Sequence, residues 1–265
     1  MAKTSIDTWN PEFLTTSPIF NTIKVAASYH TDSAQWPTLE QLKQQFKDTN
    51  HPVTPVPQGE KPSQFEDQYE PRIYLRRELQ TRNENWHDFF NAMVWLTFTK
   101  TKSYLNERHY FAALEREPGS NRSVLENAIT LFDECGIIII SDDEQLLDMI
   151  RQHQWKDLFY HHKDQFNKNI FCYVFGHAIY EKALAPYIGM TCQALLINST
   201  DLIHSCRNNQ LTEIDDFLAH YWRNHCIQSS DDLNAFPVLG IPGLHKDNNN
   251  ESFYENRDYF RPIKK

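Results

Sequence analysis

The sequence predicts an α+β fold that is predominantly α-helical, a cluster of helices with one small antiparallel sheet in the form of a β-hairpin. Three observations support this prediction. Apolar residues recur at helical spacing through most of the chain, one pair of apolar runs is typical of a hairpin, and only 7 of the 265 residues are glycine. A chain of this length can bury a large core, and we expect residues 1–265 to form a single domain.

Prolines interrupt the predicted elements in the first part of the chain. Residues 1–33 predict short helices and loops, and residues 34–48 predict a helix because their apolar residues recur at helical spacing. Residues 49–71 hold five prolines, which predicts an irregular segment. Residues 72–75 predict a short strand.

The stretch 85–116 combines a helical apolar pattern with polar residues at both of its ends. On one straight helix His87 and His109 would lie about 33 Å apart. The threonines around Phe98 favour a break, because threonine has a low helix propensity. An antiparallel hairpin folded at Phe98 would bring the two histidines level. The sequence leaves both arrangements open, since neither proline nor glycine stands at that point.

The second half of the chain predicts the hairpin and most of the remaining helices. Residues 128–141 predict the β-hairpin, with Gly136 in its turn. Ser141 and Glu144 form a capping-box pattern at the start of the next helix. The other predicted elements are helices at 141–153, 155–166, 170–184 and 211–225, a strand at 193–199, and an irregular tail from residue 234 that packs over the body.

Composition narrows the functional classes. The net charge of −9 makes nucleic acid an unlikely partner and disfavours an anionic membrane surface. The sequence holds no glycine-rich phosphate motif and no CxxC among its five cysteines, so we expect free thiols in a reducing compartment. No apolar run predicts a leader segment or a membrane span, and a cytoplasmic location follows as the expectation.

Several polar residues around the helical stretch are candidates for a functional site. The imidazole and carboxylate groups that suit acid–base catalysis are His87, Asp88, His109, His177 and Glu181. The candidates for substrate binding are Asn91, Lys102 and Asn106. The cofactor is unknown, but a divalent metal ion would have His87, His109 and His177 as its candidate ligands.

Each candidate also has a structural explanation. Asp88 can cap a helix, and His177 and Glu181, four residues apart, can form a local bond on a solvated helix face. Turn chemistry alone can explain Asp133 in the predicted hairpin. Two hypotheses therefore stay open. The first is a metal- or acid–base-dependent hydrolase with a cleft of His, Asp, Asn and Glu residues. The second is a non-catalytic binding protein, of unknown partner, whose polar residues are structural.

Five short motifs occur in an order that resembles a known family. They are NWHDFFNAMVWLTF followed by K, LN and H; TLFDECG; FGHAIYEK with a later proline; PVLGIPG; and FRP. In this order they are similar to the bacterial domain-of-unknown-function family DUF3025, over about residues 69–262. The resemblance implies a family-like core at 69–262, preceded by an N-terminal arm and helix at 1–68. It implies no established activity, substrate or cofactor.

The resemblance also implies which positions belong to the family pattern. They are Trp86, His87, Asp88, Asn91, Lys102, Leu105, Asn106, His109, Asp133, Glu134, Gly136, Gly176, His177 and Glu181. One position departs from it, because members of the family commonly have proline where this chain has Thr99. A proline there would enforce a break in the helix. Because Thr99 stands in its place, any break at Phe98 must form without that proline.

Overall fold

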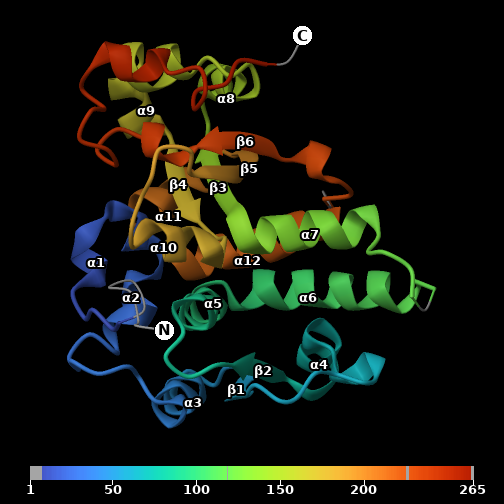
Figure 1. Cartoon of the computed structure of the whole chain (residues 1–265). Coiled ribbons are helices and arrows are strands. Elements are labelled where there is room, and N and C mark those ends of the chain that lie inside the picture. Colours follow the sequence, from blue (N-terminus) through green and yellow to red (C-terminus); the bar gives the residue numbers. More distant parts are fainter. Residues whose placement is uncertain (1–7, 118, 225–226, 264–265) are drawn as a thin grey trace.

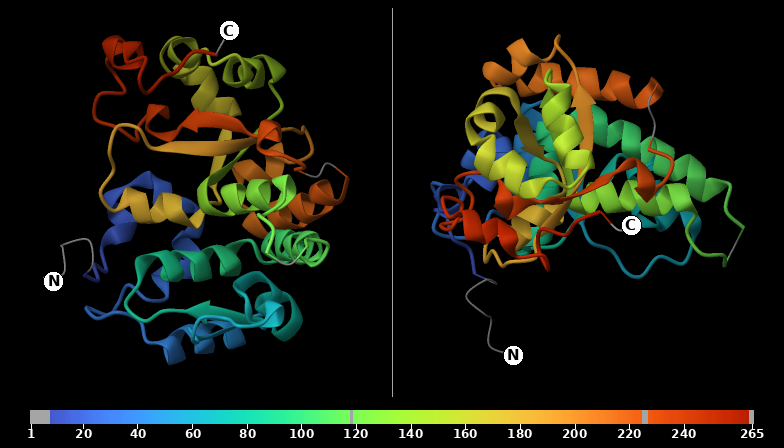
Figure 2. Two further views of the ribbon diagram at one scale, coloured as in Figure 1. Left: turned by 45° about the vertical axis from the view of Figure 1, so that its right-hand side comes forward. Right: turned by 90° about the horizontal axis from the view of Figure 1, so that it is seen from above.

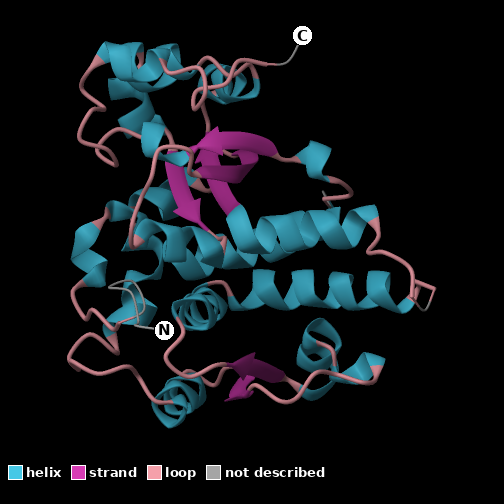
Figure 3. Ribbon diagram, in the orientation of Figure 1, coloured by secondary structure: helices cyan, strands magenta, loops and turns pink. Residues whose placement is uncertain are grey.

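The strands form two separate sheets that lie among helices (Figure 3). The computed structural model describes residues 8–117, 119–224 and 227–263. The larger sheet has the strand order β4 (Phe171–Val174), β3 (Gly136–Ser141), β5 (Thr191–Asn198) and β6 (Asn234–Pro237). Its central strands β3 and β5 are parallel, and each outer strand is antiparallel to its neighbour. The smaller sheet is a parallel pair of β1 (Thr54–Pro57) and β2 (Glu78–Thr81).

The predicted β-hairpin at 128–141 is wrong, although the predominantly helical α+β class is confirmed. Residues up to Cys135 belong to helix α7 (Val124–Cys135), which Ser123 and Glu126 begin with a capping box. Strand β3 follows at Gly136 without a linker, and its partners come from later in the chain. The sheet is therefore mixed and four-stranded, where the sequence predicted one small antiparallel hairpin.

Helices cover the larger sheet on two sides (Figures 1 and 2). Helices α8 (Glu144–Arg151) and α9 (Lys163–Asn169) lie on one side with the C-terminal tail, while α7, α10 (His177–Ala183) and α12 (Leu211–Asn224) lie on the other. The tail buries Phe236, Leu239 and Phe260, which confirms that it packs over the body. The smaller described helices are α1 (Phe13–Thr16), η2 (Pro18–Ile23), α2 (Lys24–Ser28), η3 (Phe65–Asp67), the π-helical η4 (Asp157–His161), α11 (Ile203–Arg207), η5 (Ser230–Asp232), η6 (Val238–Gly240) and η7 (Glu251–Glu255).

Three further predictions need correction. Residues 72–75 lie in helix α4 (Tyr69–Arg76), and the strand that follows it is β2. The predicted helix at 170–184 contains strand β4 before α10 begins. Helix α8 is capped by Asp143, whose carboxylate accepts from the backbone N–H groups of its first turn, so the predicted cap at Ser141 is wrong.

Other predicted elements are confirmed with shifted ends. The helix expected at 34–48 is α3 (Leu39–Asp48), and the strand expected at 193–199 is β5. The helix expected at 211–225 is α12, which the structure describes to Asn224, so His225 lies outside the described residues, as does Cys226. The four cysteines that the structure describes are free thiols, and no described helix has both the length and the apolar character needed to cross a bilayer.

The break at Phe98, which the sequence left open, is present, but the two helices do not form an antiparallel hairpin. Helix α5 (Trp86–Thr97) ends there and α6 (Thr99–Leu114) begins. Figure 1 looks almost along α5 while α6 runs across the view, so the helices meet at a steep angle. The break survives without proline because Asp215 of α12 accepts hydrogen bonds from the backbone N–H groups of Lys100 and Thr101, at 2.8 and 2.9 Å.

The N-terminal residues belong to the core that supports α5. Trp9 stacks on Trp86 with ring centroids 4.8 Å apart. Phe13 and Phe20 are fully buried, and both rings contact Phe90. The first turns of α5, which carry several candidate site residues, are thus fixed by aromatic packing from a segment about seventy residues earlier.

Two glycines close the junction that places α10 against α7. The carbonyl of Gly136 accepts hydrogen bonds from the backbone N–H groups of Phe175 and Gly176, at 3.0 and 2.8 Å. A Cβ on Gly176 would lie 2.4 Å from the backbone nitrogen of Gly136 and 2.5 Å from Cα of Cys135. Only a residue without a side chain fits there. The junction therefore holds His177, the first residue of α10, beside the last turn of α7.

We expect Asp215→Ala to lower the free energy of unfolding by about 1–3 kcal/mol, because one buried and one part-buried N–H group at the start of α6 lose their acceptor. Chemical denaturation measures this change. The neighbouring variant Asp216→Ala removes only an exposed ion pair with Lys100 and should change stability much less. Equal effects of the two variants would contradict a capping role for Asp215.

Gly176→Ala should destabilise the protein by about 1–3 kcal/mol or more, because the added methyl group meets backbone atoms that cannot rotate away. Gly59→Ala is the matched control, since a Cβ there meets only the mobile ends of two side chains at 3.4 and 3.7 Å. Thermal unfolding of the two variants compares them directly. Wild-type stability in Gly176→Ala would show that the junction is looser than its geometry indicates.

Candidate functional site

Two histidines from distant parts of the chain meet at the junction. His87 lies in the first turn of α5 and His177 begins α10. Their Nε2 atoms are 3.0 Å apart, and the rings are nearly perpendicular. The sequence left open whether His87 meets His109 and proposed His87, His109 and His177 as ligands of one ion; in the structure His87 meets His177, and His109 lies beside Thr130.

A carboxylate faces the other nitrogen of each histidine. Nδ1 of His87 lies 3.0 Å from Oε2 of Glu181. Nδ1 of His177 faces Oδ2 of Asp133 at 3.6 Å, which is longer than a formed hydrogen bond, and this buried atom has no hydrogen-bond partner. An acid therefore stands behind each ring, hydrogen-bonded to His87 and 3.6 Å from His177, while the two Nε2 atoms point at one another.

Glu134 completes a three-residue cluster around the two Nε2 atoms. Its carboxylate oxygens lie 3.9 Å from Nε2 of His87 and 3.6 Å from Nε2 of His177. Tetrahedral ligands around zinc stand about 3.4 Å apart, given bond lengths near 2.1 Å. Among the described residues these three form a group whose ligand atoms all lie within 4.8 Å of one another. The donor set fits a divalent metal ion.

A chain of hydrogen bonds leads from this cluster into the protein. Nζ of the buried Lys102 lies 2.5 Å from Oδ1 of Asp133 and 3.0 Å from Oδ1 of Asn91. The amide nitrogen of Asn91 donates in turn to the hydroxyl of Tyr69, at 2.5 Å. The aromatic rings of Trp95 and Phe175 lie 5.2 and 6.0 Å from the Lys102 ammonium. Lys102 thus compensates the charge of Asp133 inside the protein.

The surroundings of His87 and His177 shift the pKa values of the two histidines in opposite directions. The hydrogen bond to Glu181 raises the pKa of His87, against the opposing effect of burial. Burial lowers the pKa of His177 to about 3, so this ring is neutral at physiological pH. Burial is the largest single effect on Asp133 and acts to raise its pKa, but the charge of Lys102, the nearby histidines and the hydrogen bond from Lys102 together outweigh it, so the pKa lies below the usual value. A neutral imidazole and an ionised carboxylate are the forms that bind metal ions.

The cluster lies in the wall of a cavity of about 460 Å³. Residues of α4, α5, α6 and α7 line it together with the irregular segment before α4. Its polar lining includes Gln68, Tyr69, Glu70, Arg82, His87, Asp88, Asn91, Lys102, Asn106, His109, Arg116, Arg122, Glu126, Thr130, Asp133, Glu134 and His177. The cavity therefore gathers nearly all of the residues proposed from the sequence, with Glu181 bound to His87 just outside its lining.

Three of the predicted residues make contacts of their own within the fold. Asp88 accepts a two-pronged ion pair from Arg82, at 2.8 and 2.9 Å. The amide nitrogen of Asn106 donates to the backbone carbonyl and the carboxylate of Glu70. His109 lies apart from the cluster; its Nε2 is 3.4 Å from the hydroxyl of Thr130, and its buried Nδ1 has no hydrogen-bond partner.

Sequence reasoning did not assign Glu134, Asp133 and Tyr69 to the site. Asp133 was explained by a hairpin turn that does not exist, and Glu134 was not proposed as a site residue, although the family resemblance marked both positions. Glu181 was taken as a partner of His177 because the two are four residues apart, but it contacts His87. No pattern in the sequence marked Tyr69 as a candidate site residue, because it stands at the end of a proline-rich segment.

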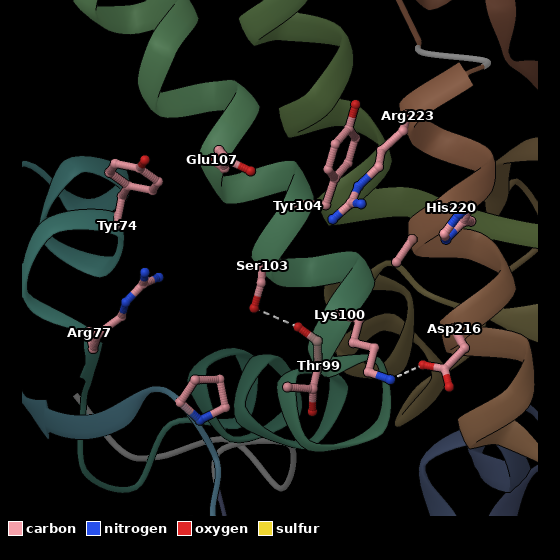
Figure 4. A pocket seen from close by; sticks show the side chains of 12 residues that line it. Tyr74, Arg77, Thr99, Lys100, Ser103, Tyr104, Glu107, Asp216, His220 and Arg223 are labelled. Atoms are coloured by element: carbon pink, nitrogen blue, oxygen red, sulfur yellow. Dashed lines mark hydrogen bonds and ion pairs between the residues drawn. The ribbon is translucent and has the colours of Figure 1, made fainter.

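A second cavity of about 750 Å³ lies between the end of α4, α6 and α12 (Figure 4). Arg77, Lys100 and Arg223 extend toward it from three different elements, and Lys100 pairs with Asp216. Tyr74 and Tyr104 flank it. His87, Glu134 and His177 do not line this second cavity, so the cavity of about 460 Å³ is the candidate site.

Comparison with known proteins identifies a family but no activity. No curated protein and no solved structure matches the chain. A sequence model of the family described as "Protein of unknown function (DUF3025)" matches residues 53–264, which is most of the chain and includes the whole cluster. The chain belongs to the DUF3025 family.

Proposed function

We propose that this protein is a metal-dependent hydrolase whose ion is held by His87, Glu134 and His177. The observation that carries the proposal is the convergence of two Nε2 atoms and a carboxylate while a second carboxylate stands behind each ring. Proteins commonly build metal sites in this way, with an acid that fixes the tautomer and the direction of each ligating histidine. Two histidines and one acid leave further coordination positions open, as catalytic sites require.

The protonation requirements of the cluster favour a metal ion over a simple hydrogen bond. With Nδ1–H directed at a carboxylate, each neutral ring presents a lone pair on Nε2. Two lone pairs 3.0 Å apart repel unless a cation or a proton lies between them. A divalent ion satisfies both nitrogens and Glu134 together, whereas a proton satisfies only the nitrogens.

The chemistry of such a site is hydrolytic. A divalent ion acts as a Lewis acid and lowers the pKa of a coordinated water molecule toward neutrality. The residues of this chain would hold the ion, keep His177 neutral and compensate Asp133 through Lys102. Asn91 and Asn106, proposed from the sequence to bind substrate, have side-chain contacts to Lys102, Tyr69 and Glu70, so we propose that they support the cavity wall.

A metal-free alternative uses the same residues. The pKa of His87 is raised, mainly by Glu181, which favours an imidazolium that donates to both Glu181 and His177. In that form the pair would act in acid–base catalysis, with His87 as the group that gives up and regains the proton. We further propose that residues 1–265 form one domain, because the N-terminal aromatics belong to the core under α5, and that the protein is cytoplasmic, as its free cysteines favour.

Zinc titration of the purified protein should show one site per chain. His177→Ala and Glu134→Gln should weaken zinc binding on the order of 100-fold or more, because each removes a ligand. His109→Gln should bind like wild type and is the control that separates the structural ligand set from the one predicted by sequence. Calorimetry measures the affinities, and metal analysis of the protein as purified supplies an independent check. No binding of zinc, manganese or iron to the wild type would leave the metal-free alternative.

Glu181→Gln should weaken zinc binding about 10- to 100-fold without changing the stoichiometry, because a carboxamide orients His87 less strongly than a carboxylate does. Asp133→Asn should do the same for His177, but it also leaves the buried Lys102 without its counter-charge, so a lower melting temperature is expected in addition. Glu40→Gln, which disturbs only an exposed pair with Lys43, is the control. Unchanged affinity in Glu181→Gln would argue against its orienting role.

A further inference from the structure

The direction of the hydrogen-bond chain behind the cluster is set by Lys102. An ammonium group can only donate, so the Asn91 atom that lies 3.0 Å away must be its amide oxygen. The amide nitrogen of Asn91 is then the atom that faces Tyr69, and it donates to the phenolic oxygen. The donor and acceptor roles along this series of hydrogen bonds therefore follow from the Lys102 ammonium.

In this arrangement the phenolic O–H of Tyr69 has no acceptor among the described residues. The hydroxyl accepts from Asn91, so its own O–H points away from Asn91. No described residue accepts a hydrogen bond from it. Tyr69 is only partly buried as a residue and lines the same cavity as His87, Glu134 and His177.

The surroundings of Tyr69 keep that proton in place. Burial, followed by the charge of Glu70, raises the pKa of the phenol well above its usual value. The hydroxyl is therefore a neutral donor at physiological pH, and the hydrogen bond from Asn91 keeps its O–H from pointing at Asn91. Preorganised donors of this kind stabilise negative charge on a reacting oxygen, because they need no reorientation as the charge develops.

We propose that the Tyr69 hydroxyl donates a hydrogen bond to an oxygen of the substrate in the cavity, and that the substrate is a compound whose reacting group carries a carbonyl or phosphoryl oxygen. The proposal rests on the proposed metal-dependent hydrolase. The bond to be cleaved would lie in the cavity that the metal ligands and Tyr69 line together, and the phenol would donate to the oxygen on which negative charge develops. Tyr69 is then a catalytic residue and Asn91 a positioning residue.

Acetohydroxamate tests this role without knowledge of the natural substrate, because it binds a metal ion and presents a carbonyl oxygen beside it. Protein loaded with Co²⁺ is titrated with acetohydroxamate and followed by visible absorption. Tyr69→Phe should weaken acetohydroxamate binding about tenfold or more, the effect of losing a hydrogen bond to a charged group. The affinity for Co²⁺ should stay that of the wild type, whereas the melting temperature should fall because the Asn91 amide loses its acceptor. Tyr74→Phe, in the wall of the other cavity, is the matched control.

Asn91→Asp supplies a second signature that a purely structural tyrosine would not show. Aspartate accepts from Lys102 but cannot donate, so the Tyr69 O–H turns back to it and is no longer available to the ligand. Acetohydroxamate binding should weaken as in Tyr69→Phe although the phenol is still present. Gln68→Glu adds the same charge to the cavity wall without touching Asn91 and corrects for simple electrostatic repulsion.

The outcomes separate the two proposals. Wild-type acetohydroxamate affinity in Tyr69→Phe, with Co²⁺ bound, overturns the role of Tyr69 and leaves the metal centre standing. Failure of the wild type to bind Co²⁺ overturns the metal centre, and the role of Tyr69 with it. Equal weakening in Asn91→Asp and Gln68→Glu would show that charge, and not the direction of the phenolic proton, accounts for the effect of Asn91→Asp.

Discussion

The antiparallel pairing of β3 with β4 is the constraint on which the site depends. The ladder joins the residue after α7 to the residue before α10, so the end of one helix and the start of the other must lie side by side. Gly136 and Gly176 allow an approach that no side chain would permit. Asp133 and Glu134 are thereby brought to His177 by backbone geometry, before any side-chain interaction is considered. Helix α5, which packs on α10, then supplies His87.

The polar interior of the cavity is costly unless its charges are compensated. A buried ammonium and a buried carboxylate each lose hydration, and their mutual attraction seldom returns more than that loss. Replacing Lys102 and Asp133 by apolar residues of similar volume would make an ordinary core position beside Trp95 and Phe175. The pair instead sustains a directed chain that ends at the hydroxyl of Tyr69, and it places Oδ2 of Asp133 3.6 Å from Nδ1 of His177. Orientation of these groups is a functional explanation that stability alone does not provide.

Local patterns in the sequence could predict the helices and the break at Phe98, but not the way in which distant segments pair. The run from Ala128 to Ser141 was taken for a hairpin because two apolar stretches flank an acidic tetrapeptide ending in glycine. In the fold, a helix passes directly into a buried strand at that glycine, and φ of −68° at Gly136 shows that it does not turn the chain back. Short apolar runs do not distinguish a buried strand from a buried helix, so the error at 170–184 has the same origin.

The candidate site shows the same limit at the level of single atoms. The i,i+4 spacing of His177 and Glu181 indicated a shared helix face, and the structure brings both side chains to His87. The spacing could not indicate roles, because a histidine is a ligand or a bystander according to which ring nitrogen faces inward. Glu181 faces Nδ1 of His87 and therefore orients a ring, whereas Glu134 faces both Nε2 atoms and is placed to coordinate. His109 has the same side chain as His87 and His177, and it also belongs to the family pattern. Its ring faces Thr130, so identity of residue type does not make it equivalent.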